Sequence, residues 1–193
     1  RQIYNISYSL EKKLVKLYVT DQGIGRQDGK RIAIVSTDQN LQEVLDQNRL
    51  RELEVMPVLK TCSFNKVEYF PLVNRNRKFV IAGLNYHAHC EEIGRPVPTD
   101  LIFGKAPGTA SHSCGRDVLI PKSAPNKIDY EGEISIVIGR HASNTPEDHA
   151  HEVIAGLVAI NDVNARDVQA VGNPLDAIAK AKGFETFKPH GPC

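Results

Sequence analysis

Residues 129–139 read DYEGEISIVIG, and this stretch constrains the fold more than any other part of the chain. Carboxylates at Asp129, Glu131 and Glu133 recur at every second position and lead into a β-branched apolar run. This pattern predicts one β-strand. Because successive side chains of a strand point to opposite faces, the three carboxylates are expected on the same face.

Carboxylates held this close raise one another's pKa unless water or a divalent cation neutralises them. Oxygen ligands on a rigid strand suit Mg²⁺ or Mn²⁺ better than zinc, which prefers nitrogen and sulfur. Two interpretations are therefore open. The stretch is either part of a metal site or an edge strand with a solvated acidic face.

The composition is typical of one or two folded domains. The chain has 193 residues, of which 41% are hydrophobic and 24% are charged. Lysine and arginine number 24 against 23 acidic residues, and no basic run is dense enough to predict a nucleic-acid partner. No apolar run approaches the roughly 18 residues of a membrane span, so no membrane partner is expected.

The four cysteines, Cys62, Cys90, Cys114 and Cys193, lie far apart and form no CxxC pair. This spacing favours free thiols in a reducing compartment over a zinc site or a redox dithiol. The N-terminus has no signal-peptide apolar region. We therefore expect a cytoplasmic protein, with the mitochondrion as the alternative compartment.

Residues 1–71 are predicted to form a small, β-rich N-terminal unit, and residues 72–193 a second domain, with the boundary near Pro71. Residues 14–19 and 31–35 are β-rich runs joined by a glycine-containing stretch, which predicts a hairpin with a long loop. Residues 36–38 offer helix caps ahead of a helical pattern that begins at Leu41.

A second candidate site follows residues 78–84, KFVIAGL, which read as a buried strand. Residues 85–94 then predict a short helix closed by Gly94, with His89 and Glu92 three positions apart on one face. A carboxylate beside an imidazole raises its basicity, as a general base for water requires. The alternative is an incidental surface pair.

A third cluster is VAINDVNARDVQ at residues 158–169. An apolar strand delivers Asp162 at its end, and the spacing places Arg166 and Gln169 on the same side of a turn or helix start. Asp162 is a candidate third carboxylate for the cation, although it could instead cap a helix that carries a surface Arg166–Asp167 pair. Further along, Lys182 precedes the aromatic pair Phe184 and Phe187.

Five stretches occur in order from Lys78 onward: GLNYHAHCEEIGRPVP, IFGKAPGT, IDYEGEISIVIGR, AGLVAINDVNARDVQ and KGFETFKPHGP. Together they resemble the C-terminal catalytic domain of the fumarylacetoacetate hydrolase family, including its acylpyruvase-like members. The resemblance implies an α+β fold, with a mixed β-roll and short helices behind the small N-terminal unit. Because that domain normally continues beyond the GP segment, the resemblance also implies that the domain is incomplete at Cys193.

The resemblance implies a role for each motif residue. Glu131, Glu133 and Asp162 match the family's ligands for Mg²⁺ or Mn²⁺. His89 and Glu92 match its water-activating dyad, and Lys182 matches its catalytic lysine. Arg166 and Gln169 match residues that contact the substrate, and Lys105 matches a further family lysine. This sequence departs from the usual pattern at Glu185 and His190, and in the stretch with His112 and Cys114, which we expect to be an exposed loop.

The implied activity is metal-dependent hydrolysis of a carbon–carbon bond in acylpyruvate-like 2,4-dioxo acids through a stabilised enolate. The same machinery serves decarboxylation or isomerisation of 2-oxo dicarboxylic acids, and the intact pair His89 and Glu92 favours hydrolysis. A truncated, catalytically silent binding module is the third hypothesis. The expected partners are a small 2-oxo acid and a second copy of the chain, since family members are commonly homodimers.

Overall fold

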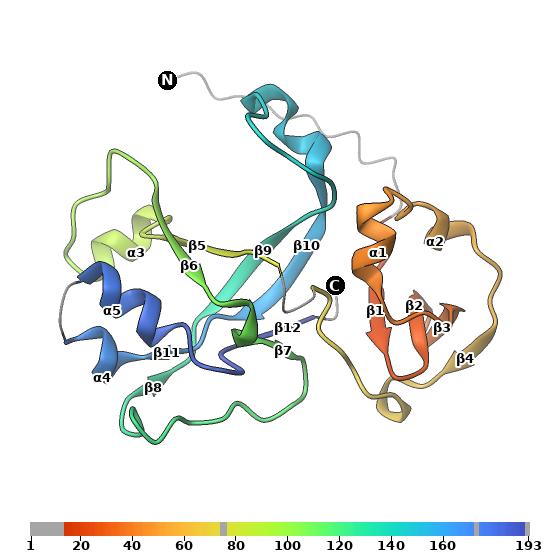
Figure 1. Cartoon of the computed structure of the whole chain (residues 1–193), viewed down its shortest axis with the longest axis horizontal. Helices are drawn as coiled ribbons and strands as arrows, with labels where there is room; N and C mark the ends of the chain where they lie inside the picture. Colours follow the sequence, from red (N-terminus) through yellow and green to blue (C-terminus); the bar gives the residue numbers. More distant parts are fainter. Residues whose placement is uncertain (1–13, 74–76, 172–173, 192–193) are drawn as a thin grey trace.

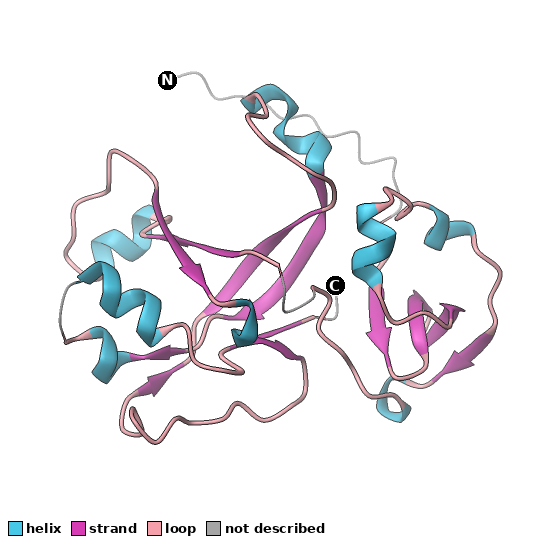
Figure 2. Cartoon of the chain, viewed as in Figure 1, coloured by secondary structure: helices cyan, strands magenta, loops and turns pink. Residues whose placement is uncertain are grey.

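The computed structural model describes residues 14–73, 77–171 and 174–191. A small β-rich part lies on the right of Figure 1, and a larger part with strands and short helices lies on the left. Figure 2 shows that strands make up the centre of the molecule and that the helices lie around them. The expected α+β fold class is confirmed.

The N-terminal part contains an antiparallel sheet in the order β1-β2-β3-β4. Its strands are β1 (Leu17–Thr20), β2 (Gly23–Asp28), β3 (Arg31–Ser36) and β4 (Lys60–Cys62). The predicted hairpin with a long loop is wrong, because the glycine-containing stretch is itself strand β2. A Cβ atom on Gly25 would come within 2.4 Å of the Ile32 side chain, so the glycine permits close packing of β2 on β3.

Two short helices, α1 (Leu41–Asp46) and α2 (Glu52–Val55), and the 3₁₀ turn η1 (Phe64–Lys66) complete this part. The cap of α1 was predicted at residues 36–38, but the side chain of Asn40 accepts the hydrogen bond from the backbone N–H of Glu43, at 3.4 Å. The helix begins at Leu41, where the helical pattern begins, and its capping residue is Asn40 instead of one of residues 36–38.

The core of the N-terminal part continues into the larger part. Leu72 and Val158 are buried in one cluster with Val19, Ile24, Val35, Leu41, Leu45 and Leu53. Val158 lies on strand β10 (Ile154–Asn161) of the larger part. The two parts therefore share apolar packing.

The larger part is built on a four-stranded sheet in the order β7-β12-β10-β9. Its other strands are β7 (Ser111–Ser113), β12 (Lys188–His190) and β9 (Gly132–Ile138). Strand β10 pairs antiparallel with β9 and β12, and β12 pairs parallel with β7. Residues 111–113 are thus a strand with Ser111 and Ser113 buried, and the expected exposed loop is wrong there.

Two smaller antiparallel pairs flank this sheet: β5 (Phe79–Gly83) with β6 (Ile102–Ala106), and β8 (Ile128–Asp129) with β11 (Asn164–Ala165). Strand β5 occurs where the sequence predicts it, but it is not fully buried, since Val80 is 53% exposed. The helices are α3 (His87–Glu92), α4 (Arg166–Gln169) and α5 (Pro174–Ala181), with 3₁₀ segments η2 (Gly108–Ala110) and η3 (Glu147–Val153). Gly94 follows α3 with a φ of +65°, as predicted for its closing residue.

The predicted single strand over residues 129–139 is wrong. Asp129 ends β8 and Glu133 lies in β9, and these strands belong to different sheets. Between them, the N–H of Glu131 donates to the side chain of Asn161, at 3.0 Å, and its carbonyl accepts from the N–H of Asp162, at 2.8 Å. These bonds take the backbone of Glu131 out of the strand ladder and attach it to the end of β10.

One side of the β9–β10 pair is apolar and exposed. We call this side the outer apolar face, and it comprises Ile134, Ile136, Ile138, Ile154 and Leu157, each 38–68% exposed. The pairing of Ile136 with Leu157 and of Ile138 with Ile154 makes this surface continuous across the two strands. On the other side, Val137 and Ala155 pack against the N-terminal core.

Cys62, Cys90 and Cys114 are free thiols, as expected, and Cys193 lies outside the described residues. Within the described ranges, no helix is long and apolar enough to cross a membrane.

Candidate active site

The β9–β10 register brings the predicted acidic residues to one end of the central sheet. Glu133 on β9 lies opposite Ile160 on β10, and Asp162 directly follows that strand. Glu131 is joined to Asp162 through the backbone, as described above. Strands β9 and β10 and the segment η3 separate Glu131 from Asp162 in sequence, yet the three carboxylates share one region.

Lysine side chains meet two of these carboxylates. The ammonium group of Lys182 contacts both Oε2 of Glu131 and Oδ2 of Asp162. The ammonium of Lys188 lies 2.7 Å from the other oxygen of Asp162, Oδ1. Because Asp162 is only 4% exposed, its charge requires such partners.

Arg166 links the acidic region to α4. Its guanidinium lies 2.7 Å from Oε1 of Glu131 and donates to Oδ2 of Asp129 and to Oε1 of Gln169, both at 2.9 Å. Asn164, which is fully buried, donates to the same oxygens of Glu131 and Gln169, at 3.1 and 2.9 Å. Two donors on Oε1 of Gln169 fix its amide, and its NH₂ group is left as a donor.

Glu133 differs from its acidic neighbours. Partial burial raises the pKa of Glu133, and the negative charge of nearby Asp162 raises it further. The described part of the chain gives Glu133 no ion pair at close range. A cation placed here would lower the pKa of Glu133 again, because its positive charge stabilises the ionised carboxylate.

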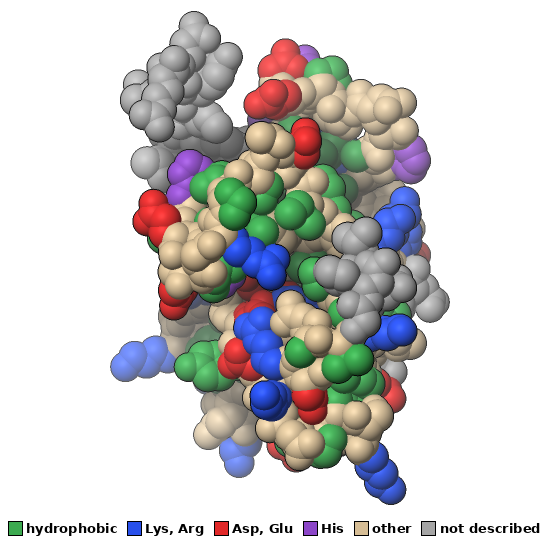
Figure 3. Space-filling view, turned by 90° about the vertical axis from the view of Figure 1, so that its left-hand side faces the viewer, with side chains coloured by type: hydrophobic (Ala, Val, Ile, Leu, Met, Phe, Trp, Pro, Cys, Tyr) green, Lys and Arg blue, Asp and Glu red, His purple; other side chains and the backbone are tan. Residues whose placement is uncertain are grey.

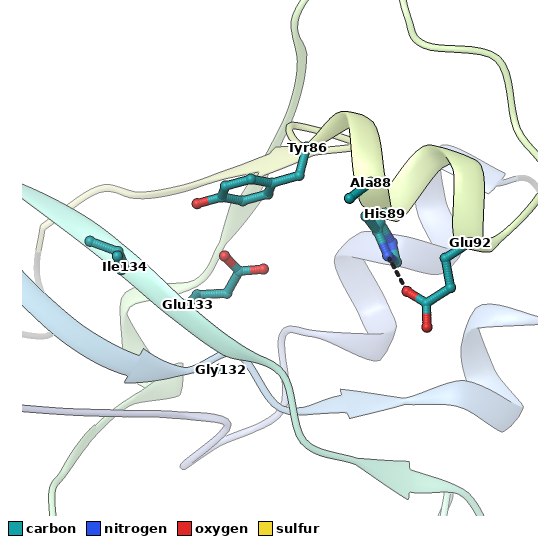
Figure 4. Close-up of a pocket in the computed structure, with 7 residues that line it drawn as sticks. All are labelled: Tyr86, Ala88, His89, Glu92, Gly132, Glu133 and Ile134. Atoms are coloured by element: carbon teal, nitrogen blue, oxygen red, sulfur yellow. Dashed lines mark ion pairs between the residues drawn. The ribbon is translucent and has the colours of Figure 1, made fainter.

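An open pocket of about 680 Å³ connects Glu133 with the predicted dyad. Figure 4 shows that Glu133 points into it from β9 toward Tyr86, while His89 and Glu92 project from α3. Nδ1 of His89 lies 3.6 Å from Oε2 of Glu92. The volume suits a small carboxylic acid together with water.

The structure thus brings together Glu131, Glu133, Asp162, Arg166, Gln169 and Lys182, with His89 and Glu92 across the pocket. Asp162 is not a helix cap, because α4 begins at Arg166 and its cap is Ala165. Lys105 is the exception: it is exposed on β6 opposite Val80, and it makes no ion pair with the acidic region in the described residues.

The donor chemistry fits a hard divalent cation. Three carboxylates supply oxygen ligands, and the Lys182 ammonium shows that a positive charge is accommodated between two of them. As the side chains stand, no three His, Cys, Asp or Glu residues within the described ranges converge closely enough to hold a metal ion. Lys182 must therefore shift if a cation is to contact Glu131 and Asp162 together.

Sequence reasoning missed two residues of this site, Asn164 and Lys188. Asn164 stands within the motif that supplied Asp162 and Arg166, and its place midway between those two charged residues was the available signal. Lys188 is fully buried, and burial lowers its pKa while Asp162 opposes that effect. Nothing in the local pattern marks a lysine on a short strand as buried.

Opposite charges also gather on the nearby surface. Figure 3 views the side of the molecule that carries α3, α4 and α5, and acidic and basic side chains lie next to one another near the middle of that face.

Residues 78–193 match the family model for the C-terminal domain of fumarylacetoacetate hydrolase. The chain belongs to the fumarylacetoacetate hydrolase family. A 124-residue stretch is 40% identical to a Burkholderia ambifaria protein named "Putative hydrolase", and covers 62% of this chain and 42% of that protein. The chain therefore spans less than half the length of the curated relatives it matches.

Solved structures of this family share the fold. A 5-carboxymethyl-2-hydroxymuconate delta-isomerase from Mycobacterium smegmatis is 26% identical, with a TM-score of 0.66 over 92% of this chain and 64% of its own. A maleylpyruvate hydrolase from Sphingobium, solved with manganese(II) and pyruvate, is 22% identical, with a TM-score of 0.69 over 92% of this chain and 65% of its own. The second likeness establishes the fold alone.

Proposed function

We propose that this chain carries the site of a divalent-metal-dependent hydrolase that cleaves a carbon–carbon bond in acylpyruvate-like 2,4-dioxo acids. The observation that carries the proposal is the placement of Glu133 and the His89–Glu92 pair on one pocket, beside the carboxylates of Glu131 and Asp162. Those three carboxylates would hold Mg²⁺ or Mn²⁺. When bound, the cation supplies Lewis-acid stabilisation of the enolate.

His89 is the base in this proposal. Glu92 faces Nδ1 of His89, so Nε2 is the atom left to take a proton from water. The resulting hydroxide attacks the distal carbonyl of the substrate, and the bond from that carbon to the methylene carbon breaks to give a carboxylic acid and the enolate of pyruvate. Glu92 stabilises the charged imidazolium. The proton held on Nε2 then returns to the methylene carbon of the enolate.

Arg166, Gln169 and Lys182 would orient the substrate. Arg166 presents a cation to the substrate carboxylate, and the NH₂ group of Gln169 is free to donate because its Oε1 is already held. Lys182 contacts the carboxylates of Glu131 and Asp162 and would donate to the oxyanion formed on the distal carbonyl.

Calorimetric titration with Mn²⁺, with and without oxalate as an enolate mimic, tests the proposal. We expect binding that oxalate strengthens and that Glu133→Gln abolishes, while Glu147→Gln on exposed η3 binds as the parent chain does. Absence of Mn²⁺ binding in the parent would refute the metal site and favour the silent binding module.

A second function, isomerisation or decarboxylation of a 2-oxo dicarboxylic acid, is favoured by the 26% identity to an isomerase. Product analysis separates the reactions. Release of pyruvate from an acylpyruvate supports hydrolysis, whereas loss of CO₂ from oxaloacetate without acylpyruvate cleavage supports the second function.

We further infer a homodimer. The outer apolar face supports this inference, because a continuous exposed apolar surface is characteristic of protein interfaces.

A further inference from the structure

Lys188 is an unusual side chain for the interior of this sheet. It lies on β12, between β7 and β10, and none of its surface is exposed. Its ammonium donates to the backbone carbonyls of Lys182, Phe187 and Val163, at 2.6, 3.3 and 3.4 Å. The backbone therefore holds this charge in place independently of Asp162.

The two lysines divide the carboxylate of Asp162 between them. Lys188 lies 2.7 Å from Oδ1, and Lys182 contacts Oδ2. Oδ1 accepts no well-aligned hydrogen bond from the described residues, so charge is what ties it to Lys188. Lys182 also contacts Glu131, and a cation that displaces Lys182 gains Oδ2 while Lys188 still covers Oδ1.

Whether a carboxylate offers one oxygen or two affects which cation fits. Ca²⁺ takes six to eight oxygen ligands in flexible geometry and commonly uses both oxygens of a carboxylate. Mg²⁺ and Mn²⁺ favour six oxygens in an octahedron, to which a carboxylate contributes one.

We propose that Lys188 is a specificity-determining residue that restricts Asp162 to one ligand oxygen, so that the site accepts Mg²⁺ or Mn²⁺ and discriminates against Ca²⁺. This inference rests on the proposed metal site at Glu131, Glu133 and Asp162. Lys188 touches no substrate in this proposal and acts through Asp162.

Calorimetric titration with Mn²⁺ and with Ca²⁺ tests it on four proteins: the parent chain, Lys188→Met, Lys188→Gln and Lys180→Met. Methionine fills the space of the lysine stem without charge, and glutamine keeps a hydrogen-bond donor, so that one variant remains informative if the other does not fold by circular dichroism. Lys180 is an exposed lysine on α5 and serves as the matched control.

We expect each Lys188 variant to narrow the ratio of Ca²⁺ to Mn²⁺ dissociation constants by about tenfold, a typical effect of groups that orient a metal ligand. Lys180→Met should leave the ratio unchanged. An equal gain in affinity for both cations would show that Lys188 acts only as a repelling charge. Unchanged affinities for both cations would show that Lys188 has no role. Either outcome overturns the inference while the proposed function stands. Absence of Mn²⁺ binding in every protein would overturn both.

Discussion

Nδ1 of His89 lies 3.6 Å from Oε2 of Glu92, one helical turn further along α3. This separation is that of an ion pair and is longer than a hydrogen bond. The two side chains are 52% and 78% exposed, so water weakens their attraction. Catalytic pairs often tighten only when substrate covers them, and the pocket beside these residues provides the place for it.

His89→Ala is expected to lower hydrolytic turnover of an acylpyruvate by about 10²- to 10⁴-fold, because it removes the general base. Its Mn²⁺ affinity should stay near that of the parent chain, since His89 is not among the proposed ligands. Initial rates of pyruvate release, together with calorimetry, measure the two effects. His141→Ala, at an exposed histidine away from the pocket, is the control, and turnover retained by His89→Ala would refute the role.

Asn164→Ala is expected to lower the free energy of unfolding by about 1–3 kcal/mol, because it removes a buried donor from Glu131 and Gln169. The variant should also raise the KM for the substrate, since Gln169 loses one of the two hydrogen bonds that fix its amide. Urea denaturation followed by circular dichroism measures the first effect. Asn126→Ala at an exposed position should change stability little, and an equally stable Asn164→Ala would contradict the structural role.

Much of the fold follows from the sequence, and the exceptions have identifiable causes. The strand at residues 79–83, the helix that carries His89 and the strand that delivers Asp162 were predicted correctly, because each has a clear period and a stop signal. The break at Glu131 was not predictable, because it depends on the side chain of Asn161, thirty residues further along. Strand β2 was missed since its glycines indicate turns locally, whereas their role is to allow contact with β3.

The sequence predicts which residues form the site, but it does not predict how their charges pair with one another. The carboxylates and the His–Glu pair are set by short motifs, which a sequence displays directly. The contacts of Lys182 with two carboxylates and the burial of Lys188 depend on the β7-β12-β10 pairing, which no local pattern reveals.

The buried ring of His190 makes stability sensitive to acid. Burial lowers the pKa of His190, which donates from Nδ1 to the carbonyl of Lys188, at 2.8 Å. The unfolded chain therefore binds more protons on this residue than the folded chain does. The contribution of the neutral His190 ring to the free energy of unfolding is fully present above its unfolded pKa of about 6.5. This contribution is lost as the pH falls below that value.

His190→Leu should therefore lose less stability than the parent chain between pH 7 and pH 5. Melting midpoints across that range measure the difference in slope, whatever the baseline stability of the variant. His141→Leu at an exposed site should keep the slope of the parent. Parallel pH profiles for His190→Leu and the parent would refute the assignment.

A charged side chain introduced into the outer apolar face is expected to prevent self-association of the chain. Ile136→Glu should convert a dimer into a monomer, because the new carboxylate would be buried without a partner in the interface. Its melting transition should stay cooperative, since Ile136 is 57% exposed within one chain. Light scattering after gel filtration measures the mass. Val55→Glu, at an 83% exposed residue of α2, is the control, and an unchanged dimer in Ile136→Glu would place the interface elsewhere.

The central position of β12 has a consequence for the order of events during synthesis. Strands β7, β9 and β10 all leave the ribosome before β12, yet β12 joins β7 to β10. The same late segment brings Lys182 and Lys188 to the carboxylates of Glu131 and Asp162. Until it emerges, the nascent chain carries a divided sheet, and the carboxylate of Asp162 has neither of its lysine partners, so closure of the sheet and neutralisation of Asp162 occur together.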